Sequence, residues 1–227
     1  MLPLPMKLGK HTLKTSDGVK ISAVLREVAD PKGWLILVHM MPATKESWKD
    51  FAEAMQKEGY ENLAIDLRGH GESKGGPDGF KNFNDAAHQA SIHDLEAAWE
   101  FLKSRGAVPD KLTVVGASIG ANLSLQFLTK NSEVQRCILL SPGDYRGIDS
   151  GELVKSLHSG QRVLFVASRK DDRSNGNNAE QNEAYYNTMP DGVEKKLIIY
   201  ESAGHGTDFL ESKEASDLTE AIKIFLT

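Results

Sequence analysis

The sequence predicts an α/β fold in which helices cover both faces of a mostly parallel central sheet. From residue 34 to the end of the chain, short apolar stretches alternate with segments of helical spacing, which is the order of a parallel sheet with crossover helices. Several of these stretches, such as "GWLILVHM" at 33–40, are continuously apolar, as expected of strands buried on both faces. An antiparallel hairpin is expected to precede this alternation.

Length and composition fit one domain spanning residues 1–227. The chain has 227 residues, of which 40% are hydrophobic and 26% are charged, and it holds no long linker or internal repeat. The net charge of −5 is mild, and no Lys/Arg stripe is interleaved with aromatic residues, so no nucleic-acid partner is expected. Cys137 is the only cysteine, which excludes an intramolecular disulfide and a thiolate metal cluster. We expect it to be a small buried residue.

The apolar runs of the sequence predict neither a membrane span nor a signal sequence. The longest runs, such as 34–38 and 163–167, are far shorter than a membrane span, so no membrane partner is expected. The first ten residues are interrupted by Pro3 and Pro5, and they lack a basic start and a long apolar centre. A cytoplasmic location follows as the expectation. A secreted protein whose signal was removed before residue 1 stays an alternative.

The strands are predicted from alternation or from continuous apolar runs. Residues 11–27 alternate on both sides of Asp17 and Gly18, which favour a tight turn, so they predict the antiparallel hairpin. The remaining strands share apolar, β-branched composition and are expected at 33–40, 60–67, 111–117, 134–141, 161–168 and 194–201. A polar, glycine-rich loop is expected at 68–79, directly after the second of these strands.

The helices are predicted from apolar residues that recur at helical spacing. In 45–59, one face would carry Trp48, Phe51, Ala52 and Met55, and Gly59 would end the helix. A long amphipathic helix is expected from residue 84 to residue 105, with Ile92, Leu95, Trp99 and Leu102 on one side. The other helices are expected at 119–130, near 151–158, around 179–189 and at 217–226.

One serine stands where a predicted strand turns into a predicted helix. The sequence there is Gly116-Ala117-Ser118-Ile119-Gly120. A sharp strand-to-helix reversal strains the central residue and crowds its neighbours, where only glycine leaves room. The turn would expose the Ser118 hydroxyl at a helix N-terminus, whose amides favour developing negative charge. This is the arrangement of a nucleophile elbow; the alternative is a glycine-rich turn that serves close helix–sheet packing.

A serine hydroxyl needs a base, and a loop histidine is the candidate. His205 lies in "SAGHGTD", directly after the last predicted strand, and therefore on the same edge of the sheet as Ser118. The other histidines in predicted helices or in the hairpin are expected to be solvated or structural; they are His11, His88, His93 and His158. Asp171 and Asp172 follow the strand at 161–168, and either could orient the imidazole. Asp171 is preferred, with Asp172 as the alternative.

The oxyanion of an acyl-transfer reaction needs two backbone donors. One is expected to be the N–H of Ile119, the residue after the nucleophile, and the other should come from the loop "HMMPA" after the strand at 33–40. Met40 and Met41 could also form a soft apolar wall for an acyl or alcohol group, or could simply pack the loop.

Nearly the whole chain resembles an α/β-hydrolase. Four stretches carry the resemblance: "GASIG" is similar to the family elbow, "HMMP" to its oxyanion segment, "DLRGHGES" to its Asp-x-Arg-Gly-x-Gly-x-Ser loop, and "AGHG" to its histidine loop. The resemblance implies a Ser-His-Asp enzyme without a metal or an organic cofactor. It gives Ser118, Asp171 and His205 as the triad, and Ile119 and Met41, rather than Met40, as the oxyanion amides.

The sequence departs from the family pattern at two places. Met40 stands where the family usually has a glycine, and because its Cβ disfavours positive φ, the loop is expected to follow its own path. His39, Asp66, Arg68 and His70 are expected to be scaffold. Only about twenty residues separate the strands at 134–141 and 161–168, so we expect no separate lid domain and an open, shallow site.

The resulting functional expectation is hydrolysis of carboxylic esters through an acyl-enzyme. The expected substrates are small or short-acyl esters. Amidase or peptidase, thioesterase and C–C hydrolase activities on the same residues are alternatives. So is a non-catalytic binding protein that kept the fold. Dehalogenases and epoxide hydrolases carry aspartate at the elbow, and dienelactone hydrolases generally cysteine, so the serine disfavours these reactions. A small-molecule ester is the expected partner, and the choice between monomer and dimer stays open.

Overall fold

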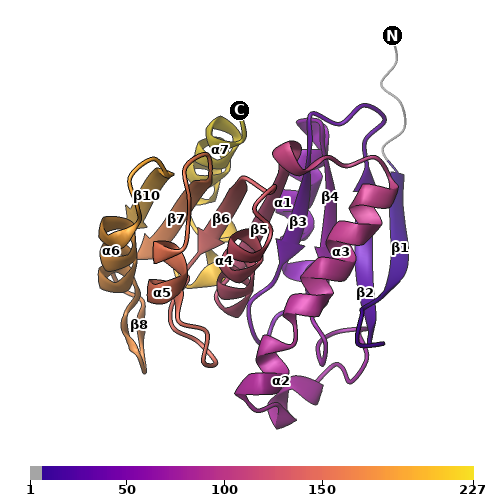
Figure 1. The fold of residues 1–227 in the computed structure, drawn as a ribbon, viewed down its shortest axis with the longest axis horizontal. Coiled ribbons are helices and arrows are strands. Elements are labelled where there is room, and N and C mark those ends of the chain that lie inside the picture. The colour runs from indigo at the N-terminus through magenta and orange to yellow at the C-terminus, as the bar shows by residue number, and fades with distance from the viewer. Residues whose placement is uncertain (1–6) are drawn as a thin grey trace.

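An eight-stranded, mostly parallel sheet forms the centre of the protein, as Figure 1 shows. A computed structural model describes residues 7–227; Pro3 and Pro5 lie outside the described residues. The strands follow the order β1-β2-β4-β3-β5-β6-β7-β10. Their bounds are β1 Lys7–Lys14, β2 Lys20–Glu27, β3 Gly33–Val38, β4 Tyr60–Ile65, β5 Leu112–Ala117, β6 Arg136–Leu140, β7 Arg162–Ser168 and β10 Glu194–Tyr200. The fold class predicted from the sequence is confirmed.

The antiparallel part of the sheet lies at its N-terminal edge. β1 and β2 form the predicted hairpin, with Lys14 opposite Lys20, and β2 also pairs antiparallel with β4. From β4 to β10 all neighbours are parallel. Because parallel strands all point the same way, the loops that follow β3, β5, β6, β7 and β10 meet at one edge.

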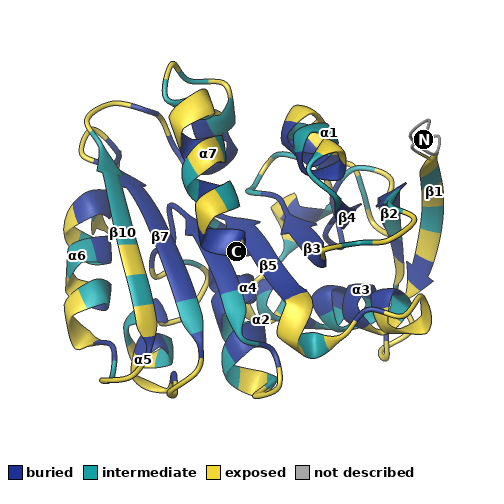
Figure 2. Cartoon of the chain, turned by 90° about the horizontal axis from the view of Figure 1, so that it is seen from above, coloured by how far each residue is buried: buried dark blue, intermediate teal, exposed yellow. Residues whose placement is uncertain are grey.

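Helices cover both faces of the sheet, as the view from above in Figure 2 shows. One core lies between the sheet and the helices α3, α4, α5 and α6, and the other lies beneath α1 and α7. Every residue of β3, β4 and β5 is buried, which agrees with the apolar sequences of β3 and β5. In β4 the buried polar residues Glu61 and Asn62 are hydrogen-bonded, to Arg105 and to the Ala52 carbonyl. The helices span α1 Lys49–Lys57, α2 Asp85–Gln89, α3 Ile92–Ser104, α4 Ile119–Lys130, α5 Ser150–Lys155, α6 Asn178–Thr188 and α7 Ala215–Leu226.

The prediction of one long helix from residue 84 to residue 105 is wrong. The chain forms α2 and α3, separated by a turn in which the amides of His93 and Asp94 donate to the carbonyls three residues earlier. The apolar spacing begins only at Ile92. Before it, residues 84–91 contain no apolar residue larger than alanine that could be buried beside His88. Without an apolar stripe, tertiary contacts decide the path of that half.

Two smaller features also depart from the sequence prediction. The turn Lys45–Trp48 before α1 is a 3₁₀ helix, and the polar loop after β7 folds into a hairpin of β8 Asp172–Arg173 and β9 Gly176–Asn177. Such two-residue strands are too short to leave an alternating pattern. Among residues 7–227, no helix has the length and apolar character needed to cross a membrane.

Candidate active site

Ser118 occupies a strained turn between β5 and α4. Its φ of 53° and ψ of −120° lie in a region that non-glycine residues rarely adopt. The Ser118 amide donates to the Leu140 carbonyl over 2.8 Å, which ties the turn to the end of β6. The carbonyl of Ser118 accepts the first hydrogen bonds of α4, so the serine stands at the N-terminus of a twelve-residue helix.

Both glycines beside the serine are required by close contacts. A Cβ on Gly116 would strike the Gly120 carbonyl and the Ser124 hydroxyl. A Cβ on Gly120 would strike the carbonyl of Val38 and lie 2.6 Å from that of His39, so α4 begins directly against the end of β3. The crowding that the sequence predicts at this turn is therefore present, and most of it comes from backbone atoms, which cannot move aside.

Asp171 and His205 meet at the same edge of the sheet. Asp171 lies three residues after the end of β7, and His205 five residues after the end of β10. The His205 Nδ1–H donates to Asp171 Oδ2 over 2.6 Å, and both residues are buried. This bond leaves Nε2 as the free ring nitrogen, which is the nitrogen that a general base would use.

The structure distinguishes between the two aspartates that the sequence left open. Asp172 is exposed and accepts a hydrogen bond from Asn177 over 2.8 Å, within the β8–β9 hairpin. Asp171 accepts from His205 and, at its other oxygen, from Arg173. Burial is the largest influence on the pKa of Asp171 and raises it, but the hydrogen bonds and charges of His205 and Arg173 outweigh burial and hold this pKa below its usual value.

The loop that carries His205 is fastened beside the elbow. The Gly206 amide donates to the Ser141 hydroxyl over 3.0 Å, and the Ala203 amide donates to the Ser168 hydroxyl over 3.2 Å. A Cβ on Gly206, whose φ is +59°, would lie 3.4 Å from the Cβ of Ala117, the residue before Ser118. The loops after β6, β7 and β10 therefore converge on the turn after β5.

The predicted oxyanion donors lie at the ends of β3 and β5. Within residues 7–227, no protein group accepts a hydrogen bond from the amides of Ile119, Met40 or Met41, so all three remain available. Met40 is outside the positive-φ region, which agrees with the departure expected from its Cβ. Met40 packs against Gly206, whereas Met41 lines the pocket of Ser118.

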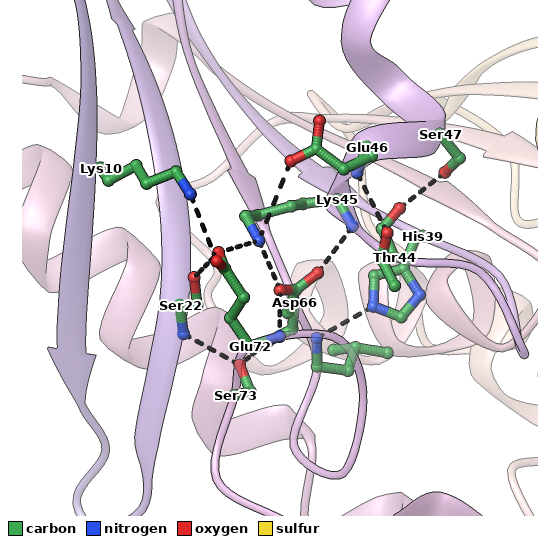
Figure 3. A network of polar contacts seen from close by, with 11 residues as sticks. Lys10, Ser22, His39, Thr44, Lys45, Glu46, Ser47, Asp66, Glu72 and Ser73 are labelled. Carbon is green, nitrogen blue, oxygen red and sulfur yellow. Dashed lines mark hydrogen bonds and ion pairs between the residues drawn. The ribbon is translucent and has the colours of Figure 1, made fainter. Parts of the chain in front are cut away.

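A buried lysine fixes the segment that follows these methionines, as Figure 3 shows. The Lys45 side chain is 3% exposed, and its Nζ donates to Asp66 Oδ2 over 2.6 Å and to Glu72 Oε2 over 2.8 Å. The Lys45 amide donates to Asp66 Oδ1 over 2.8 Å. The ion pair with Lys45 is the main cause that lowers the pKa of Glu72 to about 2. This network joins the loop after β3 to the loop after β4.

His39 completes the connection between these two loops. Its Nε2 accepts from the Leu67 amide over 3.0 Å, so its Nδ1 carries the proton and donates to the Met40 carbonyl over 2.8 Å. Burial and the neighbouring His70 lower the pKa of His39 to about 4. The ring therefore stays neutral and holds the two loops together through its hydrogen bonds, which agrees with the scaffold role expected from the sequence.

The remaining scaffold candidates are also buried. Arg68 donates from Nε to Asp94 over 2.9 Å and forms an ion pair with Asp17 over 2.6 Å, which fixes the loop after β4 to the first hairpin and to α3. His70 stacks on Phe80, with ring centroids 4.3 Å apart. The other four histidines make contacts of their own, as expected of solvated or structural residues: the His11 ring packs against Phe101, His88 is buried, His93 pairs with Glu96, and His158 contacts the Ser159 carbonyl.

Sequence reasoning missed the segment 141–149, which we call the strap. Its backbone is fastened by buried polar side chains: the Pro142 carbonyl accepts from Asn178 and Asn182, and the Gly143 carbonyl accepts from Ser150 over 2.7 Å. Asn122 of α4 also bonds Gly143 through both its amide oxygen and its amide nitrogen. Asn178 and Asn182 are four residues apart on α6, and this spacing of polar residues on a buried face was the available signal in the sequence.

The strap carries Tyr145 over the site. The Tyr145 and His205 rings meet edge to face, with centroids 6.1 Å apart. Burial raises the pKa of Tyr145 to about 12, so its hydroxyl is neutral in the physiological range. A pocket of about 430 Å³ opens between the strap, the elbow, α2 and the β8–β9 hairpin. Its lining consists of Met41, Asp85, Ser118, Ile119, Asp144, Tyr145, Arg146, Ser174 and Asn175.

Comparison with known proteins agrees with this fold. Residues 29–148, just over half of the chain, match the family described as serine aminopeptidase, S33. No curated protein sequence matches the chain significantly.

Solved structures share the fold at low sequence identity. The esterase Pf2001 of Pyrococcus furiosus is 19% identical, with a TM-score of 0.80 over 97% of this chain and 90% of that one. A CIB-like hydrolase of Thermoplasma acidophilum is 18% identical, with a TM-score of 0.72 over 98% and 99% of the two chains. The esterase EaEST of Exiguobacterium antarcticum is 16% identical, with a TM-score of 0.68 over 96% and 99%. With an elbow after β5, a histidine loop after β10 and a match over half of its length, the chain belongs to the serine aminopeptidase S33 family and is an α/β-hydrolase.

Proposed function

We propose that this hydrolase cleaves carboxylic esters through an acyl-enzyme formed on Ser118. The observation that carries the proposal is the buried hydrogen bond from His205 to Asp171, on a loop that packs beside the strained turn of Ser118. A serine in such a turn becomes reactive when an oriented imidazole lies within its reach. In this proposal Ser118 is the nucleophile, His205 the general base and acid, and Asp171 the residue that orients His205.

The proposed reaction has two halves. In the first, Ser118 Oγ attacks the ester carbonyl while His205 Nε2 takes the hydroxyl proton, and the collapse of the intermediate returns that proton to the leaving alcohol. In the second, water attacks the acyl-enzyme with His205 again as base, and the acid leaves with Ser118 restored. The Ile119 amide, together with that of Met41 or Met40, would stabilise the oxyanion, and each such donor typically lowers the activation barrier by about 3–4 kcal/mol.

The pocket supports a small or short-acyl substrate. Its volume of about 430 Å³ is at the lower end of the range of small-molecule sites, about 300–1,000 Å³. Tyr145, on the fastened strap, stands over one side of it, and Met41 offers an adaptable apolar surface on another. A long acyl chain would have to leave this space past polar residues of the strap and the hairpin.

Hydrolysis of p-nitrophenyl esters of increasing acyl length tests the proposal. We expect turnover of the acetate and the butyrate, a decline for longer acyl chains, and loss of turnover in Ser118→Ala. Ser132→Ala, which changes an exposed serine after α4, is the matched control and should keep full activity. Undiminished hydrolysis by Ser118→Ala would show that another group carries the reaction.

Aminopeptidase activity is a second candidate, and the family match favours it. The same serine, histidine and aspartate would then attack the amide that follows a free amino-terminal residue. Aminoacyl p-nitroanilides distinguish the two functions. Higher kcat/KM on the anilides than on the corresponding esters would support the peptidase, whereas turnover of esters alone supports the esterase.

A further inference from the structure

The carboxylate of Asp171 is held from two sides. Its Oδ2 accepts from His205, and its Oδ1 accepts from the Nε–H of Arg173 over 2.6 Å. The Asp171 side chain is 2% exposed and that of Arg173 is 44% exposed, so a half-exposed guanidinium covers the outer face of a buried carboxylate. The family resemblance of the sequence assigns no role to Arg173.

Arg173 belongs to a hairpin that is itself fastened. The backbone amide of Asn178 donates to the backbone carbonyl of Asp171 over 3.0 Å. This bond joins the two ends of the β8–β9 hairpin. At the tip, the Asn175 side chain donates to the Asp144 carbonyl of the strap over 3.3 Å, and Gln181 of α6 donates to the Asn175 carbonyl over 2.6 Å. Arg173 is therefore presented to Asp171 by an anchored element.

We propose that Arg173 is a positioning residue for the hydrolase reaction: its guanidinium fixes Asp171 Oδ1 so that Oδ2 faces His205, and its charge opposes protonation of the imidazole. The inference rests on the proposed function, in which neutral His205 is the base. Two consequences follow. The orientation of Asp171 depends on Arg173, and the base is kept free of a proton at a more acidic pH than without the guanidinium.

The charges around His205 support the proposed effect of Arg173 on protonation of the imidazole. Three elements contribute groups that contact His205. Asp171, in the loop after β7, accepts a hydrogen bond from its Nδ1–H, and Asp208, in the 3₁₀ turn after β10, accepts one from its backbone amide over 3.1 Å. Neutral Tyr145, on the strap, meets the His205 ring edge to face. Two carboxylates would favour the protonated imidazole. Among these contacts, Arg173 supplies the opposing positive charge through Asp171.

Three variants separate charge from geometry. Arg173→Gln removes the guanidinium, and Arg173→Lys keeps the charge but loses the planar donor that bonds Oδ1. Arg169→Gln is the matched control: Arg169 directly follows β7, is 53% exposed and pairs with Glu183 over 3.3 Å instead of with Asp171. Since Arg173 is half exposed, Arg173→Gln is expected to fold, and its melting temperature and near-ultraviolet circular dichroism verify this.

The first measurement is the dependence of kcat/KM on pH with p-nitrophenyl acetate. For Arg173→Gln we expect the acidic limb to move upward by about 0.5–1 pH unit and kcat on the plateau to fall about ten-fold, with a smaller change in KM. Arg173→Lys should restore the acidic limb but not all of kcat, and Arg169→Gln should match the unmodified protein. An unmoved acidic limb in folded Arg173→Gln would overturn the inference.

The second measurement does not need activity. The pH midpoint of the His205 ring is followed by NMR, with the signal assigned by its absence in His205→Asn. An upward shift in Arg173→Gln, with none in Arg169→Gln, supports the inference even if the protein hydrolyses none of the tested esters. An identical midpoint in Arg173→Gln and the unmodified protein overturns it, whatever the substrate of the enzyme.

Discussion

The side chains of His205 and Asp171 are joined by a 2.6 Å hydrogen bond although 34 positions separate them in the chain. The register of the sheet explains this contact. β10 runs parallel to β7 with Tyr200 beside Ser168, so the loops that leave these two residues start side by side. Each loop then needs only a few residues to bring its side chain to the edge where β5 ends at the Ser118 turn.

Replacement of Asp171 should affect catalysis far more than replacement of its neighbour. In Asp171→Asn, an amide replaces the carboxylate that orients the Nδ1–H of His205, so we expect kcat to fall by about 10³–10⁴-fold. Asp172→Asn is the control, because Asp172 is exposed and contacts Asn177. Steady-state kinetics on a short-chain ester checks both. Equal losses in the two variants would contradict the assignment of Asp171.

Alanine at position 120 should destabilise the protein despite its preference for helix. Within α4, alanine would by itself gain about 1 kcal/mol over glycine. The new Cβ, however, would meet the carbonyls of Val38 and His39, so we expect a net loss of about 3 kcal/mol in the free energy of unfolding. Gly151→Ala in α5, where the nearest atoms are side-chain atoms at 3.3 Å or more, should be close to neutral. If urea unfolding shows that Gly120→Ala is as stable as the original chain, the close contact of a Cβ at position 120 with the carbonyls of Val38 and His39 is disproved.

The two lysines that share Glu72 should differ sharply in their effect on stability. Lys45→Met leaves the carboxylate of Asp66, which is fully buried, without its cation, and breaking a buried pair in this way costs about 3–5 kcal/mol. Lys10→Met removes a 70% exposed partner of Glu72 at 3.2 Å and should cost less than about 1 kcal/mol. Denaturant unfolding of both variants gives the comparison. Similar losses in the free energy of unfolding would show that burial does not make the Lys45 ion pair more important than that of Lys10.

Stability should fall as the pH decreases through the range in which His39 would titrate. The folded state holds His39 neutral, with its pKa lowered to about 4 by burial and by His70, whereas the unfolded chain takes up a proton near pH 6.5. Between these two values the unfolded state binds more protons, so the free energy of unfolding decreases by up to about 1.4 kcal/mol for each pH unit lost.

The matched comparison for this pH effect is His39→Gln. The pKa of Asp94 is raised to about 6, mainly by burial, and acts in the opposite direction between pH 6 and 4, but it contributes equally in both proteins and cancels in the difference. The stability difference between the two proteins should therefore shrink as the pH is lowered from 7 to 4. A difference that is constant with pH would mean that His39 does not resist protonation.

Most of the fold follows from the sequence because the interior strands of the parallel sheet, such as β3, β5 and β7, are buried on both faces. Such strands leave continuous apolar runs, and the helices between them leave apolar stripes, as in Ile92, Leu95, Trp99 and Leu102 of α3. The predicted helix α4 agrees with the structure at both ends. The break before Ile92 could not be predicted, because local propensity permits helix on both sides and tertiary contacts decide the path.

The site is predictable only as far as backbone geometry dictates residue type. The glycines at 116 and 120 indicate the turn of Ser118, because side chains at those positions would strike backbone carbonyls. The strap around Tyr145 leaves only the indirect signal of Asn178 and Asn182, and the guanidinium of Arg173 leaves none, since the places of both depend on hydrogen bonds between distant elements. The roles of Ser118, His205, Asp171 and the amides of Ile119 and Met41 remain predictions.

Reaction with a fluorophosphonate probe, followed by mass spectrometry of the digested protein, tests directly whether Ser118 is an activated nucleophile. We expect one covalent adduct, on the peptide that contains Ser118, and its loss when His205 is replaced by Asn. If the folded protein stays unlabelled, as a binding protein with this fold would, or carries its adduct on another residue, Ser118 is not the nucleophile.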